Sequence, residues 1–135
     1  MKTFYILFIL LFLLGCPDQD EIPEFILKIE NNSQLDLIYN FDKEYPDTSL
    51  WELNPFNDIN IDQLTIKSGS VGEIGFFINE FSEMDPTEKI RLFLFDKESI
   101  LSLSWDTITA NRMYLQKYFL DFDDLESLNW KITYP

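Results

Sequence analysis

The 135-residue chain contains few of the side chains that usually carry out nucleophilic or metal chemistry. It has no histidine and a single cysteine, Cys16. Without an imidazole, neither the Ser-His-Asp and Cys-His nucleophile systems nor histidine metal sites can be built. The glycines within residues 67–72 lack the order of a phosphate-binding loop. The sequence therefore predicts a protein that is not an enzyme and that has no cofactor.

Carboxylates are the one abundant reactive group, with 24 Asp and Glu residues. Asp58, Asn60 and Asp62 resemble the first half of a calcium-binding loop. However, Gln63 and Gly69 stand where such a loop needs a glycine and a bidentate glutamate. We therefore predict no metal site. A hydrolase that uses paired carboxylates stays open as a less favoured alternative.

A second acidic cluster, formed by Asp121, Asp123, Asp124 and Glu126, has a simpler interpretation. The positive end of a helix dipole favours acids in the first turn, and Asp is a good N-cap residue. The cluster therefore predicts the start of a short helix.

Cys16 follows an unbroken apolar run, Phe4 to Leu14, with Lys2 before it. A membrane-spanning helix needs about 20 apolar residues, so this run is too short to span. A positive residue, a short apolar run and a small residue before the cleavage point are typical of a secretory signal peptide.

The tetrapeptide Leu13-Leu14-Gly15-Cys16 resembles the bacterial lipobox. The resemblance implies cleavage between Gly15 and Cys16 and acylation of the Cys16 sulfur, which makes membrane lipid a partner. It divides the chain into a signal peptide (1–15), a lipidated acidic tether (16–23) and a single globular domain (24–135). The acids Asp18, Asp20 and Glu21 resemble the signal that sends Bacteroidota-type lipoproteins to the outer membrane and the cell surface. The periplasmic face is the alternative.

Two further stretches, 45–50 and 117–135, resemble those of small envelope lipoproteins of Bacteroidota-type bacteria. This resemblance covers most of the chain after Cys16. It implies a location and no activity.

Charge and cysteine content limit both the classes of partner and the means of stabilising the domain. Without Lys2, nine basic and 24 acidic residues give the chain from Cys16 onward a formal charge of −15. Such a charge disfavours nucleic acid as a partner. With Cys16 acylated, no disulfide can form, so the domain depends on its hydrophobic core alone.

The long segment 45–59 has no sustained period and carries Trp51 and Phe56. These aromatics either contact a ligand or fold back onto the core, and the second alternative is favoured. We expect a non-catalytic binding module for an envelope protein or glycan. The alternative is an accessory subunit that helps to build or hold an outer-membrane complex.

Alternating apolar residues predict most of the elements that position these side chains. Residues 24–30 and 35–41 alternate on either side of Asn31, Asn32 and Ser33, which predicts a β-hairpin. The segment 71–78 alternates too, and it places Ile78 on the apolar face. Glycines within it predict a bulge or a close backbone approach. Ile90 to Phe95 is apolar on both faces except at Arg91, which predicts a central strand.

The period changes toward the C-terminus. Asp96, Ser104 and Asp121 are expected to cap short helical segments, and Trp130 to Tyr134 alternates as a last strand. The fold we predict is mainly β, with antiparallel sandwich-like sheets and two short helices near the C-terminus. The alternative is α+β with one curved antiparallel sheet.

Overall fold

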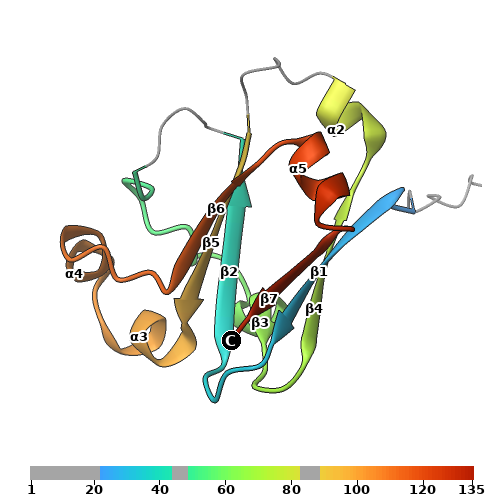
Figure 1. The fold of residues 1–135 in the computed structure, drawn as a ribbon. Coiled ribbons are helices and arrows are strands. Elements are labelled where there is room, and N and C mark those ends of the chain that lie inside the picture. Colours follow the sequence, from blue (N-terminus) through green and yellow to red (C-terminus); the bar gives the residue numbers. More distant parts are fainter. Residues whose placement is uncertain (1–21, 44–48, 83–88) are drawn as a thin grey trace, which may run out of the picture.

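The computed structural model describes residues 22–43, 49–82 and 89–135. Within these ranges the chain is mainly β and forms two sheets, as Figure 1 shows. The three-stranded sheet has the order β4 (Val71–Phe76), β1 (Phe25–Asn31), β7 (Lys131–Tyr134). The four-stranded sheet has the order β3 (Thr65–Ile66), β2 (Leu37–Asp42), β5 (Ile90–Asp96), β6 (Gln116–Leu120). The prediction of a sandwich-like, mainly β fold is confirmed.

Short helices connect the strands: η1 (Ile61–Leu64), α2 (Ile78–Ser82), α3 (Lys97–Ser102), α4 (Trp105–Ala110) and α5 (Phe122–Ser127). The three predicted caps are confirmed, because the side chains of Asp96, Ser104 and Asp121 each accept a hydrogen bond from a backbone N–H in the first turn of α3, α4 and α5. The sequence did not predict η1 and α2.

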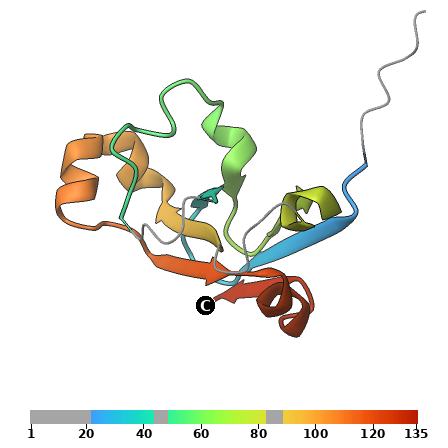
Figure 2. The same ribbon diagram turned by 90° about the horizontal axis from the view of Figure 1, so that it is seen from above.

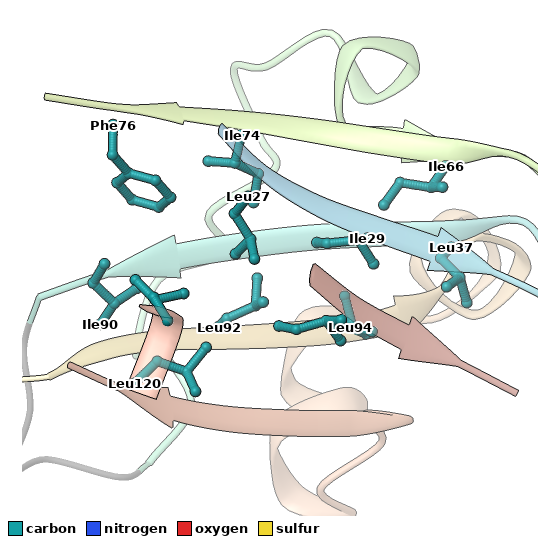
Figure 3. Packing of buried hydrophobic residues seen from close by; sticks show 12 residues of the cluster. Leu27, Ile29, Leu37, Ile66, Ile74, Phe76, Ile90, Leu92, Leu94 and Leu120 are labelled. Carbon is teal, nitrogen blue, oxygen red and sulfur yellow. The ribbon is translucent and has the colours of Figure 1, made fainter. Parts of the chain in front are cut away.

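The main core lies between the two sheets and is shown in Figure 3. Alternate residues of β1, β4 and β7 face alternate residues of β2, β5 and β6, and α5 adds Leu125. The buried side chains are Leu27, Ile29, Leu37, Ile66, Ile74, Phe76, Ile90, Leu92, Leu94, Leu120, Leu125 and Ile132. All are aliphatic except Phe76, so interdigitated branched side chains fill the sandwich.

The predicted β-hairpin between residues 24–30 and 35–41 is wrong, because β1 and β2 belong to different sheets. Asn31, which is buried, turns the chain from one sheet to the other. Its Nδ2 donates to the carbonyls of Leu35 (2.7 Å) and Ile66 (3.0 Å), and its Oδ1 accepts from Ser33. Alternation is the same for two strands that pair side by side and for two that face each other across a core, so periodicity could not separate these arrangements.

The four-stranded sheet is covered on its other face as well. Figure 2 shows the loop from residue 49 to residue 60 and helices α3 and α4 lying together on one side of the sheets. A second core fills this layer, formed by Ile38, Phe56, Phe93, Phe95, Trp105 and Ile108. β5 lies between β2 and β6 and is buried on both faces, so the prediction of a central strand is confirmed.

β4 pairs with β1 without interruption, and its glycines mark close approaches. A Cβ at Gly72 would lie 2.5 Å from Ile66 Cγ1, and one at Gly75 would lie 2.7 Å from Pro23. The strand ends at Phe76, so the expectation that Ile78 lies on the buried face is wrong. Ile78 begins α2, and its side chain is 47% exposed.

The last strand pairs with β1 in parallel, whereas the other pairings are antiparallel. Asn129 and Trp130 take the left-handed conformation, with φ of 52° and 55°, and this turns the chain from α5 into β7. Asparagine is one of the residues that take this conformation readily at the end of a helix. Ile132 is buried, and Trp130 and Tyr134 pack against the main core, as the alternation predicts.

Candidate functional site

The outer face of the four-stranded sheet holds a buried arginine. Because side chains alternate along β5, Arg91 shares this face with Phe93 and Phe95, and it is 1% exposed. Asp42 lies directly opposite on β2. The Arg91 guanidinium donates from Nε to Asp42 Oδ1 (2.7 Å) and from Nη2 to Asp42 Oδ2 (2.6 Å). Its Nη1 donates to the Ser49 carbonyl (3.0 Å). The two-point pairing offsets the large cost of burying a charge.

Trp51 lies over this arginine. The Arg91 Cζ is 5.3 Å from the centre of the Trp51 ring, a cation–π distance, and the Phe93 ring meets Trp51 edge-on at 5.2 Å. The Trp51 carbonyl accepts a hydrogen bond from Trp105 Nε1 (2.9 Å). Trp51 is therefore held by both the sheet and α4, and it remains partly accessible to solvent.

Phe56, the second aromatic that sequence analysis named, lies deeper. It is 4% exposed and packs edge-on against Phe95 and Trp105, at 5.7 and 6.0 Å between ring centres. Both aromatics thus pack on the sheet, as the favoured alternative predicts. Of the two, Trp51 is the one that could still contact a ligand.

A shallow hollow of about 530 Å³ opens beside Trp51 and is lined by Ser49, Leu50, Trp51, Glu52, Leu53, Asn54 and Pro55. Leu53 is 84% exposed at its rim. Asn54 Oδ1 accepts from the Phe56 N–H (2.9 Å), which fixes the turn of the loop. The described lining offers an aromatic ring, an amide, a carboxylate and an apolar side chain. Such a mixture suits non-covalent contacts with a sugar ring or an extended peptide.

A neighbouring group of aromatics was missed by sequence analysis. Tyr114 and Phe119 also contact Phe93, at 5.4 and 6.4 Å between ring centres. Lys117 Nζ lies 5.5 Å from the Tyr114 ring centre and 5.4 Å from that of Phe119. The spacing of Lys117 and Phe119 could have predicted this group, because residues two positions apart lie on the same face of a strand such as β6.

The acidic stretch that resembled a calcium loop makes hydrogen bonds and an ion pair within the fold. Asn60 Oδ1 accepts from the Asp62 N–H (3.1 Å), and the Asp62 carboxylate pairs with Lys97 Nζ (2.8 Å). This hydrogen bond from Lys97 lowers the pKa of Asp62. Among the described residues, no group of three or more acidic or cysteine side chains could hold a metal ion.

The second acidic cluster forms a capping box at the start of α5, as predicted. Asp121 Oδ1 accepts from the Asp124 N–H (2.8 Å), and Asp124 Oδ2 accepts from the Asp121 N–H (3.2 Å). Lys89 joins both carboxylates, at 2.9 and 2.8 Å. The backbone hydrogen bond from Asp124, with help from Lys89, lowers the pKa of Asp121, and the two carboxylates raise the pKa of Lys89. The contribution of Lys89 could not be predicted, because it comes from a distant part of the chain.

The predicted signal peptide, the cleavage point at Gly15 and Cys16, and most of the tether lie outside the described residues, as do residues 45–48 of the long segment. No helix within the described ranges is long and apolar enough to cross a membrane. The chain matches no protein family model, no curated protein and no solved structure.

Proposed function

We propose that this chain is a lipid-anchored, non-catalytic binding module of a bacterial cell envelope. In this proposal acylated Cys16 holds it on the outer membrane, with the domain at the cell surface. The observation that carries the binding role is the hollow beside Trp51. The cation–π contact of Trp51 with Arg91 and its edge-on contact with Phe93 support it, because rigid and partly exposed aromatics make good binding contacts at low entropic cost.

The anchor is tested at Cys16 itself. We expect Cys16→Ser to lose the mass of the acyl chains and to move the protein from the membrane fraction to the soluble fraction, because two or more chains are needed for stable attachment. Ser99→Ala, a change far from the tether, serves as the matched control. Unchanged mass and partitioning of Cys16→Ser would refute the lipid anchor.

The location is tested separately, because lipidation and export to the surface are different steps. Replacement of Asp18, Asp20 and Glu21 by Ser should keep the lipid mass and protect the domain from protease added to intact cells. If the unaltered protein is already protected from that protease, the domain faces the periplasm.

The binding role is tested at the rim of the hollow. A benzophenone amino acid at Leu53 should crosslink to an envelope component on intact cells, and the same group at Leu101 of α3 should not. Both positions are well exposed, at 84% and 58%, so general accessibility does not explain a difference. Trp51→Ala should reduce the Leu53 crosslink. Equal labelling at both positions would count against a site here.

A further inference from the structure

The tether joins the domain at a well-defined place. Pro23 lies over Gly75 on the outer face of the three-stranded sheet, with 2.7 Å between the Pro23 side chain and the position of a Cβ at Gly75. The next residue, Glu24, accepts a hydrogen bond at Oε2 from the Ile78 N–H, at 2.6 Å. These contacts direct the chain past the end of β4 and the start of α2.

Exposed isoleucines gather at this place. Ile22 and Ile78 line a second shallow hollow of about 410 Å³, together with Glu24, Phe77 and Asn79. Ile22 is 86% exposed and Ile78 is 47% exposed. Ile26, 41% exposed, lies opposite Gly75 on the same outer sheet face. We call Ile22, Ile26 and Ile78 the anchor-end isoleucines.

The length of the tether limits what can cover these side chains. Ile22 lies six positions after Cys16, and an extended chain advances at most about 3.6 Å per residue, so Ile22 lies within about 22 Å of Cys16. If Cys16 is acylated, the lipid surface lies within reach of this end of the domain. Apolar side chains exposed there gain free energy by leaving water for the interface.

We propose that the anchor-end isoleucines rest on the lipid surface that holds the acyl chains of Cys16. This inference depends on the proposed lipid anchor. Contact of these isoleucines with lipid would set the orientation of the domain relative to the membrane. Figures 1 and 2 show the start of β1 and α2 on one side of the molecule and α3 and α4 on the opposite side. The layer that carries the Trp51 hollow lies beyond the four-stranded sheet, away from the sheet face on which Pro23 lies.

Acylation of Cys16 allows a spin label to be placed at one chosen position, because a cysteine introduced elsewhere would then be the one free thiol. The experiment places a nitroxide on Ile78→Cys, and separately on Leu101→Cys of α3, in the full lipidated chain on phosphatidylcholine vesicles. Collision rates with oxygen, which enriches in lipid, are compared with those for a water-soluble nickel chelate. We expect the oxygen-to-nickel ratio at position 78 to exceed that at position 101 several-fold.

A second variant tests the role of the apolar contacts. Ile22→Asp with Ile26→Asp should return the label at position 78 to water, whereas Val71→Asp should not. Val71 is also exposed on the outer face of the sheet, at the other end of β4.

The outcomes separate the two proposals. A lipidated Cys16 with a fully aqueous label at position 78 would overturn the contact and leave the anchor standing. A second labelled thiol at Cys16 would show that it is not acylated, and that would overturn both.

Discussion

Arg91 is the residue whose role changes most between the sequence and the structure. In the sequence it interrupts an apolar strand. In the structure it is a buried cation, paired with Asp42 on the neighbouring strand and covered by Trp51. A guanidinium suits this position because its planar fork matches a carboxylate and stacks on an indole at the same time. The pair thereby joins the long segment after β2 to the sheet.

A first prediction concerns this pair. Arg91→Met should lower the free energy of unfolding by about 3 kcal/mol or more, because it leaves the Asp42 carboxylate without its guanidinium partner in a largely buried position. The double variant Asp42→Leu with Arg91→Met should recover much of that loss. Urea unfolding measures both.

The control for this prediction is an exposed ion pair. Lys131→Met removes the pair with Glu30 (2.7 Å) on the solvent-facing side of the other sheet, and it should lower the free energy of unfolding far less, because water and salt screen an exposed pair. If Arg91→Met costs no more than Lys131→Met, the buried pair does not stabilise the fold.

At the scale of elements, the capping box of α5 couples stability to pH. The folded-state pKa of Asp121 is lowered, so its contribution is present above the ordinary carboxyl pKa of about 4 and is lost as pH falls below it. The folded-state pKa of Lys89 is raised, so its contribution is present below the ordinary lysine value and is lost in strongly alkaline solution.

A second prediction follows for Asp121→Asn. Asn remains a good N-cap, so α5 should persist, but the charge on which Lys89 acts is halved. The free energy of unfolding should fall less between pH 5 and pH 3 in the variant than in the unaltered protein. The difference should be below about 1 kcal/mol, because solvent screens this partly exposed pair. Urea unfolding at each pH measures it. Asp123→Asn, in the same turn, is the matched control. An unchanged pH profile for Asp121→Asn would contradict the role assigned to the box.

At the scale of the whole molecule, the dominant property is the formal charge of −15 after Cys16. Like charges on a folded surface repel one another and favour the expanded chain, and salt screens them.

The corresponding prediction uses the unlipidated Cys16→Ser protein. Its free energy of unfolding should rise between about 10 mM and 200 mM sodium chloride, where the Debye length falls from about 30 Å to below 10 Å. Guanidinium is itself a salt, so the measurement needs urea. A fall in stability with salt would show that the surface ion pairs outweigh the repulsion.

Local patterns in the sequence determined much of this protein. A run that is apolar on both faces identified β5 as central. Short polar side chains marked the caps of α3, α4 and α5, because a cap depends on residues only three positions apart. The absence of histidine and the apolar run before Cys16 likewise shaped the expectation of a non-catalytic, anchored protein.

Tertiary structure alone decided which strands pair and which residues meet. Periodicity shows that a strand has an apolar face, but not whether its partner lies beside it or across the core, so β1 and β2 could not be assigned to different sheets. The pairing of Arg91 with Asp42, and of Lys89 with Asp121, joins residues 49 and 32 positions apart. Such contacts depend on how the whole chain folds back on itself, and no local pattern encodes them.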